Sequence, residues 1–439
     1  MPLLLYINLT GLFLSGEAVM KNRWLIAACA VGIHISIGSV YAWSVVTKPA
    51  MAHFGCSLKA VTFTFSIAII FLGLSAAFFG HFVESKGPRK SGTLSAIFFG
   101  CGMLGAAVAC TLKSLPLLYL TYGVLGGCGL GIGYITPVST LIKWFPDKRG
   151  MATGMAIMGF GFAALIAGPI MQELIVSVGL VKMFLILGSI YFVLIFSSAQ
   201  YLAPPQQGWA PAGFHEKIKT GKKKIKADLA NLTANESIKT LRFYFLWIML
   251  FINVTCGIAV ISVASPMAQE IAKMTPMAAA TMVGFMGLFN GLGRIVWSSL
   301  SDHLGRPAVW VTFFVIQIAA FMLLPKLTEA IVFQIVIFLI FTCYGGGFAS
   351  VPAYISDIFG TKQVSAIHGY ILTAWSAAGL TGPMLASLLK EKTQSYAVAP
   401  YIFSGFFVVA LAVSLLMIAN IKTHRALKEA IPRPETVVE

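Results

Sequence analysis

One basic side chain lies where the sequence otherwise holds apolar residues. Arg294 falls inside the apolar stretch 284–297, whereas the other Lys and Arg residues lie at segment ends, in loops or in tails. A charged side chain at the centre of a membrane costs roughly 2.5–3.5 kcal/mol on insertion scales, so such residues are usually functional. Because no Asp or Glu lies at a similar depth, we expect an external anion to be the partner of Arg294.

Asn290 precedes Arg294 by one helical turn, so the two side chains would share a helix face. Asn290 would either orient the guanidinium and donate to a carboxylate oxygen, or form an interhelical hydrogen bond. Helical side chains lean toward the N-terminus of their helix. We therefore expect the Arg294 guanidinium to lean toward the middle of the membrane rather than back to the nearer surface.

Two histidines are the remaining titratable candidates near this depth. His34 and Tyr41 are spaced to share one face of the first expected span, and His368, Leu372 and Trp375 have the same spacing in the eleventh. An imidazole changes charge near neutral pH, so either histidine could couple a proton to function. The alternative for each is a packed histidine held by a hydrogen bond.

The composition is that of a polytopic helical membrane protein. Of the 439 residues, 58% are hydrophobic and only 10% are charged, against about 25% charged in soluble proteins. The net charge of +16 lies in short loops between apolar runs, which favours a membrane over a nucleic acid as partner. The seven cysteines fall mostly inside spans and are interpreted as apolar fillers. No cofactor or metal site is predicted.

Apolar windows predict an all-α membrane fold with twelve spans in two halves. The expected domains are 1–19 as a non-native extension or interfacial segment, 20–202 as the first six-helix half, 203–242 as a basic linker, 243–420 as the second half and 421–439 as a tail. The expected spans are 24–47, 61–83, 93–112, 115–142, 150–172, 180–202, 243–268, 277–300, 308–325, 328–352, 364–388 and 398–420.

Basic residues are concentrated on one side of these spans. They gather in the segments that an inside N-terminus would place in the cytoplasm, which predicts cytoplasmic termini and, for this class of protein, the bacterial inner membrane.

The linker lysines of 217–226 are interpreted as solvated, with anionic lipid as the alternative. Residues 1–19 lack a basic leader, whereas Met20 precedes a basic start, so Met20 is the expected initiator. We expect a monomer.

The two halves repeat each other. Glu84 and Asp302 each precede a glycine by three residues, and a basic residue follows, Arg89 in one half and Arg306 in the other. A Gly-Pro pair likewise recurs at 168–169 and 382–383. We expect Glu84 with Arg89, and Asp302 with Arg306, to lock loops of a gate. Paired halves with a site between them near the membrane midplane are typical of secondary transporters.

Several motifs then resemble a known family. The two loop repeats and Gly159…Gly168-Pro169 resemble motifs of the major facilitator superfamily, with Glu84 in place of the usual Asp. Five further motifs resemble the oxalate:formate antiporter family. They are Asn22-Arg23-Trp24, Tyr41-Ala42-Trp43, Trp144-Phe145-Pro146-Asp147-Lys148-Arg149-Gly150, Leu288-Phe289-Asn290-Gly291…Arg294 and Ser356-Asp357-Ile358-Phe359-Gly360-Thr361.

The resemblance implies a substrate site. In the oxalate/formate exchanger an arginine and a lysine hold the dicarboxylate; Arg294 matches the arginine, whereas Trp375 falls where the lysine would be, and Leu372 replaces a tryptophan. The aromatic positions of the family are matched by the following residues: Tyr41, Tyr134, Phe160, Tyr344 and Phe348. One charge with an apolar wall suits one carboxylate, so a monocarboxylate of the lactate, pyruvate or formate type is the preferred substrate.

Three other functions compete with that of a monocarboxylate carrier. The resemblance leaves the oxalate:formate antiporter as its alternative within transport. A carboxylate sensor with a transporter fold is more remote, because the linker is too short for a signalling domain. A membrane enzyme is not expected, since the sequence shows no buried nucleophile–base pair, metal cluster or pair of intramembrane acids.

Overall fold

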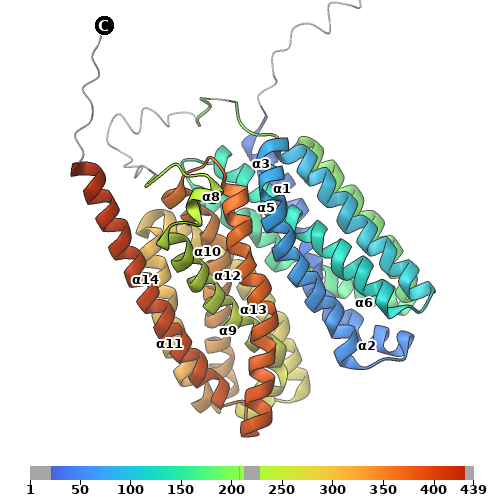
Figure 1. Ribbon diagram of the computed structural model, residues 1–439. Coiled ribbons are helices and arrows are strands. Elements are labelled where there is room, and N and C mark those ends of the chain that lie inside the picture. The colour runs from blue at the N-terminus through green and yellow to red at the C-terminus, as the bar shows by residue number, and fades with distance from the viewer. Residues whose placement is uncertain (1–20, 207, 212–227, 431–439) are drawn as a thin grey trace, which may run out of the picture.

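The computed structural model describes residues 21–206, 208–211 and 228–430. The expectations for residues 1–19 and for the lysines of 217–226 lie outside this part of the chain. Within it the structure is helical and contains no strand, which confirms the predicted fold class. Figure 1 shows two helical bundles, built from the first and second halves of the sequence.

The first bundle begins where Asn22 caps a helix, its side chain accepting from the backbone N–H of Trp24 at 2.8 Å. Its elements are α1 (Arg23–Gly38), the 3₁₀ turn η2 (Ser39–Ala42), α2 (Trp43–Phe54), α3 (Leu58–Thr111), α4 (Leu115–Leu118), the π-helical η3 (Tyr119–Gly126), α5 (Gly127–Trp144) and α6 (Arg149–Tyr201). Long apolar runs with capped starts explain these helices.

The second bundle follows the linker and the short helix α8. Its elements are α8 (Ala234–Ser237), α9 (Leu241–Ile271), α10 (Pro276–Leu304), α11 (Arg306–Leu323), the 3₁₀ turn η4 (Leu324–Lys326), α12 (Ala330–Phe359), α13 (Val364–Thr393) and α14 (Val398–Ala430). Helix α10 starts with a capping Thr275 and with Pro276 in its first turn, both favoured there. Helix α14 runs ten residues past the predicted end of its span.

Nine helices in the described ranges are long and apolar enough to cross a membrane. Two of them are each divided by a glycine with positive φ, Gly87 in α3 (φ 78°) and Gly179 in α6 (φ 85°). Glycine accommodates this backbone conformation without steric cost. With α10, which has 29 residues, the described helices therefore supply a crossing for each of the twelve predicted spans.

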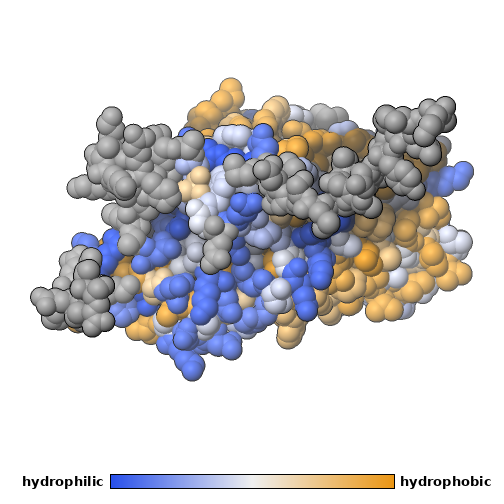
Figure 2. Space-filling view, turned by 90° about the horizontal axis from the view of Figure 1, so that it is seen from above, coloured by the Kyte–Doolittle hydropathy of each residue, from blue (hydrophilic) through white to orange (hydrophobic). Residues whose placement is uncertain are grey.

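The end of the bundle that carries Lys86, Arg149 and Arg306 is called the basic end. Figure 1 shows the two bundles together near α8, at this end, and diverging toward α2. Seen from above, hydrophilic residues gather on this end while hydrophobic surface covers much of the sides (Figure 2). This distribution is expected of a protein whose sides face lipid.

The bundles meet mainly along two helix pairs, α6 with α10 and α3 with α13. Their backbones touch at glycines: a Cβ on Gly161 would lie 2.8 Å from Gly291 Cα, and one on Gly80 would collide with Ala366. Farther from the basic end on α10, a Cβ on Gly284 or Gly287 would meet no atom within 4 Å. The bundles are therefore in contact from the basic end to about the middle of α10, and separate beyond it.

Candidate functional site

Arg294 lies on α10 in the middle of the molecule, at the level where the two bundles separate. Its side chain is fully buried. Nε donates to Asn290 Oδ1 at 3.2 Å and Nη1 donates to the carbonyl of Ile157, on α6 of the other half, at 3.1 Å. Nη2 has no hydrogen-bond partner in the described part of the chain. Asn290 thus orients the guanidinium, and the Nη2 group remains available to a ligand.

An aromatic cluster surrounds this guanidinium. Phe160 and Phe348, one from each half, lie beside it with their ring centroids 5.8 and 5.4 Å from Cζ. Trp375 is central to the cluster, with ring centroids 4.6 Å from Phe348, 5.4 Å from Tyr134 and 5.7 Å from Phe160. These contacts bring together side chains from α5, α6, α12 and α13. The cluster forms an apolar wall around one cation.

Polar atoms on the wall complete the site. The hydroxyls of Tyr41 and Tyr134 are directed toward Arg294, and that of Tyr344 is directed toward Tyr41. All three are buried and make no hydrogen bond of ordinary geometry within the described residues, and the same holds for Trp375 Nε1. Phenol and indole groups can donate, and a carboxylate only accepts. The arrangement is suited to a small anion that binds the guanidinium and takes further hydrogen bonds from the hydroxyls.

The remaining predicted residues border this cluster. His34 donates from Nδ1 to the Ala30 carbonyl at 3.1 Å, and its ring lies 5.3 Å from that of Tyr134. The ring of His368 lies 5.8 Å from the same Tyr134 ring, and neither of its nitrogens is paired within the described ranges. Both histidines therefore contact the cluster directly, closer than their spacing of two helical turns suggested. Leu372 is buried beside the crossing of α13 with α3.

Arg294 has no counter-charge among the described residues. The ion pairs found among the described residues lie toward the two ends of the helices, and none of them includes Arg294. A buried guanidinium without a carboxylate partner is costly to keep. The electrostatic requirement of the site is therefore for a negative charge.

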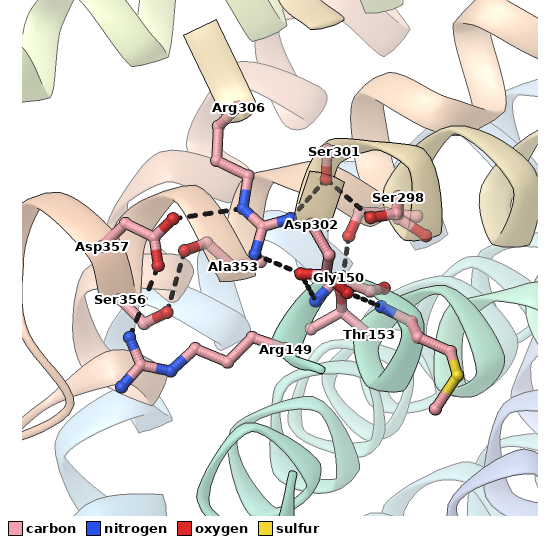
Figure 3. Close-up of polar contacts among 12 residues, drawn as sticks. Arg149, Gly150, Thr153, Ser298, Ser301, Asp302, Arg306, Ala353, Ser356 and Asp357 are labelled. Atoms are coloured by element: carbon pink, nitrogen blue, oxygen red, sulfur yellow. Dashed lines mark hydrogen bonds and ion pairs between the residues drawn. The ribbon is translucent and has the colours of Figure 1, made fainter. Parts of the chain in front are cut away.

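A second polar cluster closes the basic end (Figure 3). Arg306 donates to Asp302 at 2.6 Å and to Asp357 at 3.1 Å, and Arg149 of the other half contacts Asp357 at 3.4 Å. Both Asp302 oxygens also accept backbone N–H groups at the start of α6, from Gly150 and Met151, at 2.9 Å. Asp302 thus caps a helix of the opposite half, where the helix dipole favours a negative charge.

Asp302 and Arg306 bond to each other, whereas Glu84 and Arg89 bond to different partners; the gating role expected of these four charges stays a prediction. Glu84 binds Lys143 at 2.9 Å and accepts the N–H of Ser365 at 2.7 Å, at the start of α13 in the other half. Arg89 instead donates to Gln200 at 2.7 Å. The turn at Gly87 separates the two side chains. Glu84 caps α13 as Asp302 caps α6, so the two caps are reciprocal between the halves.

Three residues of this cluster were not among the predicted site residues. Arg149 and Asp357 stood within quoted motifs without a role, and Asp228 lies in the linker. Arg149 pairs with Asp228 at 2.6 Å, and Leu229 N–H donates to the Asp357 carbonyl at 2.8 Å. The linker is therefore fastened to the cluster. One sequence signal could have indicated Arg149 and Asp357: each stands in a quoted motif, and both motifs lie at the basic end of the expected spans.

We expect Asp302→Asn to loosen the contact of the halves at the basic end. The substitution removes an ion pair and weakens two hydrogen bonds to a charged acceptor, interactions worth about 1.5–3 kcal/mol each. Spin labels at the exposed Lys90 and Lys362, one in each half, would report a new population at longer distance. Arg89→Ala is the control and should leave the distances unchanged. Identical distance distributions for wild type and Asp302→Asn would contradict a gating role.

Residues 24–383 match the family model of the Major Facilitator Superfamily. The chain belongs to this superfamily. Superfamily membership and the transporter relatives described next make the protein an integral membrane transporter and not an enzyme. Among solved structures of the superfamily, the Escherichia coli fucose:proton symporter aligns with a TM-score of 0.68 at 13% identity, covering 90% of this chain and 99% of the symporter. That likeness concerns the fold.

Relatives within the superfamily confirm the resemblance noted from the motifs. The oxalate:formate antiporter of Oxalobacter formigenes is 28% identical over 379 residues, covering 84% of this chain and 86% of the antiporter. An uncharacterized MFS-type transporter of Escherichia coli, YhjX, is 29% identical over 80% of this chain and 84% of its own length. Human monocarboxylate transporter 10 is 26% identical over 73% of this chain and 62% of its own length.

Proposed function

We propose that the protein is a secondary transporter of small monocarboxylates, of the lactate, pyruvate or formate type, and that Arg294 binds the carboxylate. The observation that carries this proposal is the buried guanidinium, which has an unpaired Nη2 and the hydroxyls of Tyr41 and Tyr134 directed toward it but no ion-pair partner among the described residues. A carboxylate would neutralise the charge and accept these hydrogen bonds. The aromatic wall would surround a short apolar or hydroxylated remainder.

The choice of a monocarboxylate rests on Trp375. A dicarboxylate carries a second charge, whereas Trp375 packs among the rings of Tyr41, Tyr134, Phe160 and Phe348 and supplies no cation. An anionic group left unpaired in such surroundings costs several kcal/mol. The similarity to the oxalate:formate antiporter supports oxalate/formate exchange as the second candidate. The similarity to monocarboxylate transporter 10 supports the first.

Alternating access fits the contacts between the halves. Besides Arg294, further buried side chains of the described part bond across the halves: Thr153 Oγ1 donates to the Ala349 carbonyl at 2.8 Å, and Ser376 Oγ donates to the Ile70 carbonyl at 3.0 Å. These bonds and the polar cluster at the basic end would separate when that end opens. By the positive-inside rule we place the basic end, and both termini, in the cytoplasm of a bacterial inner-membrane protein.

Uptake into proteoliposomes tests the proposal. Labelled lactate, pyruvate, formate and oxalate would each be offered with and without a pH gradient. Accumulation of a monocarboxylate, with counterflow when the same acid is preloaded, is the expected result. Substrate binding without counterflow would instead make the protein a sensor.

If transport is coupled to protons, we expect His34 to contribute more than His368. Its Nδ1 donates to the Ala30 carbonyl, so in the neutral ring Nε2 is a bare acceptor, and it is buried and unpaired within the described part. His34→Gln should then reduce the response of uptake to an imposed pH gradient severalfold, with His368→Gln as the matched comparison. A full response in the double variant would exclude both histidines, and pure exchange would leave neither with an effect on coupling.

A further inference from the structure

Glycine at one position of α6 leaves the space that Arg294 occupies. A Cβ built on Gly161 would lie 3.2 Å from Arg294 Nε and 2.8 Å from Gly291 Cα. The first distance is shorter than an ordinary contact, and the second would force the two backbones apart. The side chain of Arg294 therefore passes over α6 at a point where that helix presents only backbone to it.

This close approach lets a side chain of one half reach the main chain of the other. Arg294 Nη1 donates to the carbonyl of Ile157, which lies one turn before Gly161 on α6, at 3.1 Å. With Nε held by Asn290 and Nη1 by Ile157, Nη2 is the group that remains unpaired and buried. The crossing thus fixes which nitrogen of the guanidinium is left for a ligand.

We propose that Gly161 is a positioning residue for carboxylate binding: its missing side chain lets Arg294 bond to the first half and present Nη2 to the substrate. The inference rests on the proposed function and adds a specific requirement to it. Because the guanidinium is bonded to both halves, a carboxylate held by Nη2 is positioned relative to both of them. A methyl group at position 161 would rotate or withdraw the fork rather than remove its charge.

The test compares alanine substitutions at glycines of the same two helices. Gly161→Ala should raise the KM for the transported monocarboxylate by about tenfold or more, with a smaller change in maximal rate. Gly168→Ala on α6 and Gly287→Ala on α10 are matched controls, because a Cβ there would lie 3.9 Å from Val45 or meet nothing within 4 Å. Both controls should keep the KM of the wild type.

The variant Gly154→Ala distinguishes a purely structural role of Gly161 from a role in positioning Arg294. Its Cβ would press on Ser298 and on the Arg294 carbonyl, at the same crossing but away from the guanidinium. If Gly154→Ala and Gly161→Ala change KM and maximal rate alike, Gly161 serves packing alone and the proposal is overturned. A KM that rises in Gly161→Ala and stays within twofold of the wild type in Gly154→Ala supports it.

Two more variants keep the test decisive. If Gly161→Ala does not accumulate in membranes, Gly291→Ala replaces it, since its Cβ would press on the Phe162 ring and separate the same helices. An unchanged KM in that variant overturns the proposal. Arg294→Ala serves as reference: wild-type transport by it would refute the proposed function itself, whereas its failure together with a normal Gly161→Ala refutes only the inference about Gly161.

Discussion

Arg294→Ala is expected to abolish both substrate binding and uptake while folded protein still reaches the membrane. The guanidinium is the one buried cation of the site in the described residues, and its removal leaves a carboxylate among aromatic rings with no compensating charge. Breaking a buried charge pair costs about 3–5 kcal/mol, so affinity should fall by two orders of magnitude or more. Uptake in proteoliposomes and calorimetric titration with the same acid measure the two effects.

Arg294→Lys sharpens this prediction, since it keeps the charge and loses the geometry. Lysine cannot bind Asn290 and Ile157 and still present a third donor in the fixed fork of a guanidinium. We expect it to retain little transport. Arg89→Ala is the control for loss of a basic residue, because Arg89 is exposed at the basic end and bonds to Gln200. Uptake by Arg294→Ala at the wild-type rate would remove Arg294 from the mechanism.

The helical architecture was predictable because it depends on local sequence. Membrane-length apolar runs must form helices to pair their backbone groups, and the glycines at 87 and 305 mark turns with positive φ in both halves. The residues around Arg294 were also predictable, from helical spacing such as 290 to 294 and from resemblance for Phe160 and Phe348. Their convergence in one cluster follows from the way six-helix halves pack.

Contacts between the halves were less predictable, because they depend on where a helix of one bundle ends against the other. The expectation for Glu84 grouped it with Arg89, its neighbour in sequence, and did not foresee that it caps α13 more than two hundred residues away. The bond from Arg294 to the Ile157 carbonyl involves a backbone group, for which residue type carries no signal. Asp228 reaches Arg149 only because the linker lies against the end of α12.

Trp375→Lys is expected to shift specificity from monocarboxylates toward oxalate. Trp375 lies within the aromatic cluster, 4.6 Å from the Phe348 ring and 5.4 Å from the Tyr134 ring, and it supplies bulk without charge. A lysine would place a second cation in the site, on α13 rather than on α10, where it could neutralise the second carboxylate of oxalate. It would also remove apolar surface that a monocarboxylate contacts.

Both acids must be measured on both proteins, because specificity is a difference between two affinities. We expect Trp375→Lys to bind oxalate about tenfold more tightly than the wild type does and to bind lactate or pyruvate more weakly. Repulsion from Arg294 in the empty site and the leucine at position 372 limit the gain. Trp375→Phe, which keeps an aromatic ring without charge, is the matched control and should gain no oxalate affinity. If the wild type already binds oxalate as tightly as lactate and pyruvate, the tryptophan does not select against a second charge, and oxalate/formate exchange becomes the better assignment.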